Sequence, residues 1–288
     1  MTHLLTIANL GREGLSEILT LSERPDPGRP LAGKGVALVF QKPSARTRNS
    51  MEMAVVQLGG HPVHIQKEEV GLGTRETAED VARTLACYHA LIAARVLDHR
   101  DLEAMAAATG TPVLNLLSDR AHPLQALADL LTVRQLLGRL EGARIAYIGD
   151  ANNVCRSLAE ACSLLGVELR VASPAGYGLD ERLDHVTQLT DPAEAVDGAD
   201  IVYTDVWVSM GQDGQAEARA KAFAAYRVDE ALMALCPEAR FLHCLPARRG
   251  EEVSAGVIDG PRSAVWRQAE NRMHTARGAL AWLIGVRP

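Results

Sequence analysis

Short apolar runs that are rich in β-branched residues alternate with longer amphipathic runs along most of this 288-residue chain. The apolar runs predict strands at 36–40, 90–94, 112–114, 143–148, Glu168–Ala172, Ile201–Thr204 and 241–242. Helical patterns fill most of the intervals, and strands joined by helices pair in parallel. The sequence therefore predicts an α/β protein with mainly parallel sheets that are flanked by helices on both faces.

A break in this alternation predicts two domains. The long helical pattern Pro123–Leu137 ends beside Gly138, and Gly142 precedes a new strand. We therefore expect one domain at 1–138, with a C-terminal helix from 270–288 packing back on it, and a second domain at 139–269. Open α/β sheets bind ligands beyond the carboxyl ends of their strands. We expect the active site in the cleft between the two domains.

Composition and charge exclude several classes of partner. The net charge of −6 argues against nonspecific binding of nucleic acid, which requires a basic face. No apolar run approaches the length that spans a bilayer, and the first residues lack the pattern of a signal peptide. The five cysteines are an odd number without close spacing, which is typical of reduced thiols. We expect a cytoplasmic protein that contacts neither nucleic acid nor membrane.

The segment 44–48 has the sequence Ser-Ala-Arg-Thr-Arg and lies between a predicted strand and an amphipathic run. Its hydroxyls and guanidiniums therefore lie at the start of a helix, where backbone N–H groups and the helix dipole favour an anion. Arg46 can form a bidentate contact with phosphate oxygens. The segment is interpreted either as a phosphate site or as a capped helix with solvated arginines.

Other polar side chains also follow predicted strands. Arg95 comes directly after 90–94, and His122 precedes Pro123, a residue suited to the first turn of a helix. Each residue alone is more typical of a surface charge or a structural histidine. Three strand ends that each supply a cation or a proton donor indicate an anion site more strongly.

The second half offers candidates for binding a small polar ligand. Asp205 follows a predicted strand and could hold an ammonium group, or it could simply begin a turn. Asn153 lies in a loop after Gly149 that lacks the second and third glycines of a dinucleotide-binding motif. His243 and Cys244 are adjacent on a strand, so their side chains point to opposite faces and make a poor catalytic dyad. No chelating spacing supports a metal site from these two residues and His122.

Taken together and in this order, six segments resemble the transcarbamylases. The segments are 44–48, Arg95, 122–125, 205–211, 243–246 and 270–272. Two of them, 205–211 and 243–246, are similar to the corresponding segments of the ornithine-specific members. The resemblance covers nearly the whole chain, and the combination is highly specific although no single motif is.

The resemblance implies that carbamoyl phosphate and L-ornithine give L-citrulline and phosphate, in arginine biosynthesis or breakdown, without a metal or organic cofactor. It assigns a set of residues to carbamoyl phosphate: Ser44, Ala45, Arg46, Thr47, Arg95, His122, Gln125, Cys244, Leu245 and Arg272. Four of these are implied to be catalytic: Arg46, Arg95, His122 and Cys244. It assigns Asn153, Asp205, Ser209 and Met210 to ornithine. It also implies a homotrimer or a multiple of trimers, with sites at subunit junctions.

Three positions depart from the family pattern. Ala45 replaces a common threonine and removes one hydroxyl beside the predicted phosphate site, although the backbone N–H remains. Gln41 replaces a common glutamate and removes a charge near Arg46 or its neighbours. The segment 70–76 resembles only loosely the loop that reaches a neighbouring subunit's site, which leaves the role of Arg75 open.

Other readings of the sequence remain open at this stage. A transcarbamylase could act on putrescine, lysine or N-acetylornithine, although Asp205, Ser209 and Met210 favour a free α-amino acid. A nicotinamide-dependent oxidoreductase could use the loop at Gly149, but its glycine pattern is incomplete. A non-catalytic relative that binds carbamoyl phosphate or a partner is the third alternative.

Overall fold

The computed structural model describes residues 3–208 and 213–288 of the chain, in two compact units. Unit 1 comprises Met1–Ala128 and Asn271–Pro288, and unit 2 comprises Asp129–Glu270. Two helices, α6 (Pro123–Leu137) and α12 (Val265–Leu283), contribute residues to both units. Within the described residues, every helix is too short or too polar to span a lipid bilayer.

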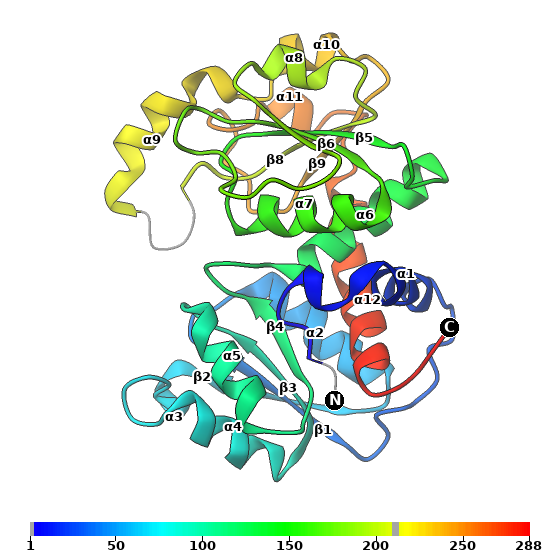
Figure 1. Cartoon of the computed structure of the whole chain (residues 1–288). Helices are drawn as coiled ribbons and strands as arrows, with labels where there is room; N and C mark the ends of the chain where they lie inside the picture. Colours follow the sequence, from blue (N-terminus) through cyan, green and yellow to red (C-terminus); the bar gives the residue numbers. More distant parts are fainter. Residues whose placement is uncertain (1–2, 209–212) are drawn as a thin grey trace. The chain divides into compact units, whose positions relative to one another are not determined.

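Unit 1 is built on a four-stranded parallel sheet in the order β2-β1-β3-β4 (Figure 1). Its strands are β1 (Gly35–Phe40), β2 (His61–Gln66), β3 (His89–Arg95) and β4 (Val113–Leu117). Its other elements are η1 (Ile7–Asn9), α1 (Gly11–Ser22), α2 (Ala45–Gln57), α3 (Lys67–Val70), α4 (Ala78–Ala86) and α5 (His99–Ala108). Leu4 pairs with Leu114 beyond β4, so the first described residues continue the sheet.

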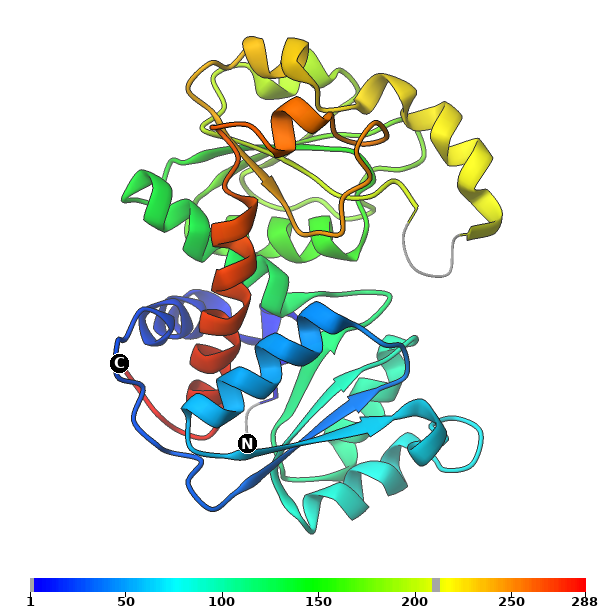
Figure 2. The same cartoon turned by 180° about the vertical axis from the view of Figure 1, so that it is seen from behind.

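Helices cover both faces of the unit 1 sheet. On one face, α4 and α5 pack apolar side chains such as Val81 and Leu102 against Ile92 of β3. On the other face lie α1, α2 and α12, which Figure 2 shows side by side. Arg277 of α12 donates to Gln57 of α2 at 3.0 Å, and these contacts fix the helix that carries Arg272.

The ends of the strands coincide in unit 1. Phe40, the last residue of β1, is the register partner of Arg95, the last residue of β3. The turn after β1 leads directly into α2, which begins at Ala45. The segment 44–48 and Arg95 are therefore brought to the same edge of the sheet.

Unit 2 is built on a five-stranded parallel sheet in the order β7-β6-β5-β8-β9. Its strands are β5 (Arg144–Ile148), β6 (Glu168–Ala172), β7 (Val186–Leu189), β8 (Ile201–Thr204) and β9 (Arg240–His243). Its other elements are α7 (Asn153–Leu165), α8 (Pro192–Val196), η2 (Asp213–Gln215), α9 (Ala216–Phe223), η3 (Ala224–Tyr226), α10 (Glu230–Ala234) and α11 (Ala255–Ile258).

The core of unit 2 sets the position of two polar residues. Phe241 of β9, Val202 of β8 and Phe223 of α9 belong to one buried apolar cluster on a face of the sheet. Thr204, the last residue of β8, is the register partner of His243, the last residue of β9. Asp205 and Cys244 therefore follow adjacent strand ends.

The α/β class with parallel sheets is confirmed. The seven predicted strands are all present, and the helix Pro123–Leu137 has the predicted bounds. Two edge strands, β2 and β7, were not predicted. Both lie at the margin of a sheet and carry polar side chains that break the apolar pattern.

Candidate active site

The start of α2 offers anion-binding groups of two kinds. Ser44 is the N-cap, with extended backbone, and its Oγ accepts the Thr47 N–H at 3.4 Å and donates to Thr47 Oγ1 at 3.1 Å. Thr47 is buried, whereas Ala45 and Arg46 are exposed. The segment 44–48 is therefore a capped helix, as one interpretation of the sequence predicted. The cap occupies the Thr47 N–H, while the start of the helix and its dipole still favour an anion.

Arg95 joins this group from the end of β3. Its Nη1 donates to Thr47 Oγ1 at 3.5 Å, and its side chain is almost fully buried. Burial, and next the positive charges of Arg272 and Arg46, lower the pKa of Arg95 to about 10. The guanidinium is still charged at neutral pH, so unit 1 holds a cation that is buried close to two others.

His122, Gln125 and Arg272 form a second hydrogen-bonded group in unit 1. Arg272 Nη1 donates to Gln125 Oε1 at 2.6 Å and lies 3.4 Å from His122 Nε2. Because a guanidinium can only donate, His122 accepts at Nε2 and carries its proton on Nδ1. Burial, then the charges of Arg272 and Arg95, hold the pKa of His122 well below its ordinary value. A neutral imidazole with an Nδ1 proton can donate to a substrate oxygen.

The two groups act on each other electrostatically. Arg95 and Arg272 both lower the pKa of His122, and Arg46 and Arg272 both lower that of Arg95. Guanidiniums that destabilise one another in a partly dry region gain most from a multivalent anion. The arrangement in unit 1 is therefore suited to a phosphate group with a carbonyl oxygen beside it.

Gln41 links the end of β1 to the segment after β3. Its Oε1 accepts the Leu97 N–H at 2.7 Å, and its own N–H donates to the Arg95 carbonyl at 2.9 Å. Burial, and next the charge of Asp98, raise the pKa of Asp101, and a hydrogen bond from the Gln41 side chain opposes this rise. The amide thus ties β1 to the segment after β3. A glutamate at this position would place a second carboxylate against Asp101.

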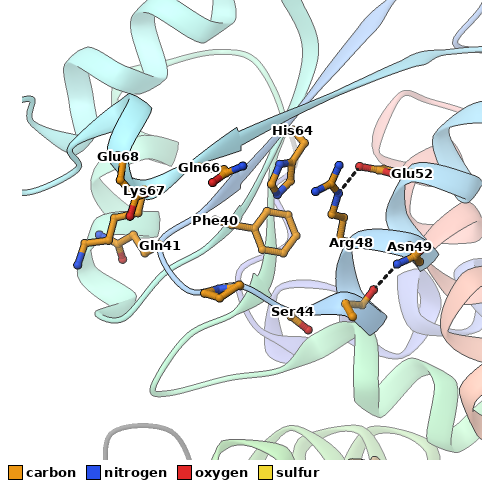
Figure 3. A pocket seen from close by; sticks show the side chains of 12 residues that line it. Phe40, Gln41, Ser44, Arg48, Asn49, Glu52, His64, Gln66, Lys67 and Glu68 are labelled. Carbon is orange, nitrogen blue, oxygen red and sulfur yellow. Dashed lines mark hydrogen bonds and ion pairs between the residues drawn. The ribbon is translucent and has the colours of Figure 1, made fainter.

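A cavity of about 670 Å³ opens beside the predicted phosphate site. It is lined by Ser44 and Ala45, and by charged and aromatic side chains that are shown in Figure 3. Arg48 is paired with Glu52 at 2.8 Å, and the rings of Phe40 and His64 lie 5.0 Å apart. Arg46, Thr47 and Arg95 do not line this cavity. The cavity therefore lies next to the guanidiniums of Arg46 and Arg95 and does not contain them.

In unit 2, Asp205 is the centre of a polar cluster. Its Oδ2 accepts from Asn152 Nδ2 at 2.9 Å, and its Oδ1 accepts from Cys244 Sγ at 2.9 Å and from the Val206 N–H at 2.8 Å. A carboxylate offers about four acceptor positions, so Asp205 retains capacity for a ligand N–H group. The cluster is suited to binding an ammonium group.

The turn after Cys244 is held by a buried histidine. His243 Nδ1 accepts the Leu245 N–H at 2.9 Å. The ring proton is therefore on Nε2, which donates to Glu252 Oε1 at 3.0 Å. Leu245 has a φ of 59° and precedes a cis proline. His243 and Cys244 thus have separate hydrogen-bond partners. Cys244 follows the last residue of β9, and its Sγ lies within 4.8 Å of a ring nitrogen of His243, so the prediction that the two side chains point to opposite faces of a strand was wrong.

Among the described residues, one group of three metal-binding side chains lies close together: Asp205, His243 and Cys244. The trio considered from the sequence included His122 in place of Asp205. Both ring nitrogens of His243 are engaged, so a metal ion there would have to displace Leu245 or Glu252. The donor set therefore favours a hydrogen-bonded cluster.

The remaining predicted residues are placed as follows. Asn153 is the first residue of α7, and Ser209 and Met210 lie outside the described residues. Asn152 was not predicted from the sequence. Its side-chain oxygen caps α7 by accepting the Val154 and Cys155 N–H groups, and its side-chain N–H donates to Asp205. An asparagine directly before a helical pattern was the signal that could have indicated it.

The lowered pKa of His122 predicts how stability depends on pH. The unfolded chain takes up a proton on this residue near pH 6.5 that the folded chain does not, so acid favours unfolding. Relative to His122→Gln, the wild type should lose about 1.4 kcal/mol for each pH unit below 6.5, until the folded pKa is reached. Urea unfolding of both proteins at a series of pH values checks this. Parallel curves would contradict it.

Comparison with known proteins agrees with this geometry. Residues 2–135 match the carbamoyl-phosphate-binding domain, and residues 141–283 the Asp/Orn-binding domain, of the aspartate/ornithine carbamoyltransferase family. The chain is 47% identical to an ornithine carbamoyltransferase from Thermus thermophilus, over 98% of this chain and 96% of the relative. It is 45% identical to one from Pyrococcus furiosus whose name adds "anabolic", over 90% of this chain and 86% of that one.

A solved structure is similar over the same extent. The chain superposes on ornithine carbamoyltransferase from Pyrococcus furiosus with a TM-score of 0.94 at 42% identity, covering 99% of this chain and 98% of the other. The two domains of this family together match nearly all of the sequence. The chain belongs to the aspartate/ornithine carbamoyltransferase family.

Proposed function

We propose that this protein transfers the carbamoyl group of carbamoyl phosphate to the δ-amine of L-ornithine, which gives L-citrulline and phosphate. The observation that carries this proposal is the group of guanidiniums Arg46, Arg95 and Arg272: the charges of Arg272 and Arg46 lower the pKa of the buried Arg95, and those of Arg272 and Arg95 lower the pKa of His122. The family membership and the names of the relatives support the same reaction.

In this proposal, unit 1 binds carbamoyl phosphate. Arg46, the hydroxyls of Ser44 and Thr47 and the N–H groups at the start of α2 hold the phosphate. The Nδ1 proton of His122 and the guanidinium of Arg95 face the carbonyl oxygen, where negative charge grows during attack. Preorganised donors at such an oxygen lower the barrier, by about 3 kcal/mol for one donor in a measured case. Gln125 Oε1, which already accepts from Arg272, accepts from the carbamoyl amino group as well.

Unit 2 supplies the groups for the amine. We propose that Asp205 binds the α-ammonium of ornithine together with Asn153, Ser209 and Met210, while Asn152 and Cys244 orient the Asp205 carboxylate. Cys244 and Leu245 then lie near the reacting amine and the carbamoyl group. A single transfer requires the domains at 1–138 (with 270–288) and 139–269 to act on one pair of substrates. Proximity then contributes much of the rate.

We also propose a cytoplasmic, biosynthetic role and assembly into trimers or multiples of trimers. The five cysteines form no disulfide among the described residues, which fits a reducing compartment. The relative named "anabolic" supports the biosynthetic direction. For assembly, we propose that the cavity beside Ser44 and Ala45 receives a side chain from a neighbour's loop 70–76, in which Arg75 is largely exposed.

Replacing Arg46 tests the phosphate site. Arg46→Ala should lower kcat/KM for carbamoyl phosphate by about 100-fold to 1000-fold, because a charged donor to the leaving phosphate is lost. Arg48→Ala is the matched control, since the Arg48 guanidinium is paired with Glu52 on the same helix. Circular dichroism should show both variants folded. Equal activities of the two variants would remove the argument for a phosphate site.

The choice of acceptor is tested by competition. Wild-type protein with carbamoyl phosphate should form citrulline from ornithine with a higher kcat/KM than the carbamoylated products of lysine, putrescine or N-acetylornithine. Asp205→Asn should raise KM for ornithine at least tenfold and leave KM for carbamoyl phosphate nearly unchanged, because the ammonium loses its counter-charge. Preference for another amine would overturn ornithine while retaining carbamoyl transfer.

Assembly is tested by native mass spectrometry. The mass should be three times the chain mass or a multiple of that value. Arg75→Ala should reduce activity without changing this mass if the loop 70–76 reaches a neighbour's site, with Arg83→Ala on the exposed face of α4 as the control. A monomer with full activity would exclude a site that is shared between subunits.

A further inference from the structure

The backbone that precedes His122 is held by hydrogen bonds within the turn after β4. The Ala121 N–H donates to Ser118 Oγ at 3.2 Å, and the Ala121 carbonyl accepts from the Ser118 N–H at 3.0 Å and from Asn115 Nδ2 at 3.3 Å. On its other side, the His122 carbonyl accepts from the Gln125 N–H at 3.0 Å, in the first turn of α6. The backbone on both sides of His122 is therefore held by hydrogen bonds.

The hydroxyl of Ser118 is the centre of this turn. It accepts from the Ala121 N–H and from Asn115 Nδ2, the latter at 3.3 Å. The shortest contact of the hydroxyl is 2.7 Å, to Nδ1 of His99 at the start of α5. Two N–H groups already point at the oxygen, and the hydroxyl proton has two acceptors within reach, His99 Nδ1 at 2.7 Å and the Ala121 carbonyl at 3.4 Å. We assign the proton to the shorter contact, with Nδ1. His99 is therefore an acceptor at Nδ1 and a donor at Nε2.

His99 is itself held in place. Its backbone N–H donates to Asp119 Oδ1 at 2.8 Å, and its side chain is buried. Burial lowers the pKa of His99, and Glu103 opposes that effect while Arg120 adds to it. A neutral imidazole is the form that can accept from a hydroxyl. The burial of the His99 ring and its contact with the Ser118 hydroxyl are thus consistent with a neutral His99 that carries its proton on Nε2.

We propose that Ser118 is a positioning residue for His122. Its hydroxyl, which donates to Nδ1 of His99 and accepts from Asn115 and Ala121, fixes the turn that aims the His122 imidazole. The proposal rests on the function proposed above, in which His122 faces the carbonyl oxygen. It predicts an effect on the transition state, where charge grows on that oxygen, rather than on the affinity for either substrate.

Kinetics of a double-mutant cycle test the proposal. Ser118→Ala should lower kcat about tenfold to 100-fold, with KM for ornithine changed less than threefold, because a misplaced donor acts mainly on the chemical step. In a His122→Gln background, Ser118→Ala should have almost no further effect. Independent, multiplicative losses in the two backgrounds would overturn the proposal.

Two further substitutions separate positioning from general damage. His99→Asn places an amide near the position of Nδ1 and should retain most of the activity, whereas His99→Gln places it near Nε2 and should behave like Ser118→Ala. Ser254→Ala is the control, because Ser254 is a capping hydroxyl on α11 with no contact to these residues. It should lower stability without changing kcat. Equal activities of His99→Asn and His99→Gln would count against the proposal.

Nitrogen-15 spectra of histidine-labelled protein give a readout that needs no turnover. The wild type should show His99 protonated at Nε2 and His122 protonated at Nδ1, with assignments from the His99→Asn and His122→Gln spectra. Ser118→Ala should mix the tautomers of His99, whose Nδ1 loses its donor, and should shift the His122 signals because the ring moves relative to Arg272. An unchanged His122 signal in that variant would overturn the positioning role. Failure of wild-type protein to form citrulline, with the spectral change present, would instead overturn the proposed function alone.

Discussion

Mutual repulsion between buried guanidiniums is the interaction on which the rest of unit 1 depends. The end of β3 positions Arg95, and α12 positions Arg272. Arg272 lowers the pKa of Arg95, and both guanidiniums lower the pKa of His122. The fold resists this repulsion through backbone and helix contacts, including those that tie α12 to α2. An anion bound beside these guanidiniums would relieve the repulsion, which is the physical basis of the proposed phosphate site.

Most of the strands that were predicted are buried on both faces, although β6 exposes Glu168. Runs such as 36–40 and Ile201–Thr204 are apolar at nearly every position, and local sequence is then sufficient. The strands β2 and β7 are edge strands with polar side chains, and β2 contains Pro62. Their strand conformation depends on pairing with β1 and β6, which no local pattern encodes.

The candidate site shows the same division. Arg95, His122 and Asp205 follow strands or precede a helix, so their gathering at strand ends could be expected from the sequence. The residues that orient them could not, because their partners lie far away along the chain. Asn152 contacts Asp205, Gln41 contacts Leu97, and Ser118 contacts His99 only after the sheets have formed. Sequence patterns predicted the groups proposed to touch substrate better than the groups that hold them.

The pairing of Leu4 with Leu114 has a practical consequence for handling the protein. The Leu5 carbonyl accepts from Asn115 Nδ2 at 2.8 Å, and the same amide holds the Ala121 carbonyl before His122. The first described residues are thus part of the support of a candidate active-site histidine. An affinity tag placed next to them is expected to disturb the pairing of Leu4 with Leu114 and the contact between Leu5 and Asn115. A tag after Pro288 follows the end of α12 and does not adjoin β4.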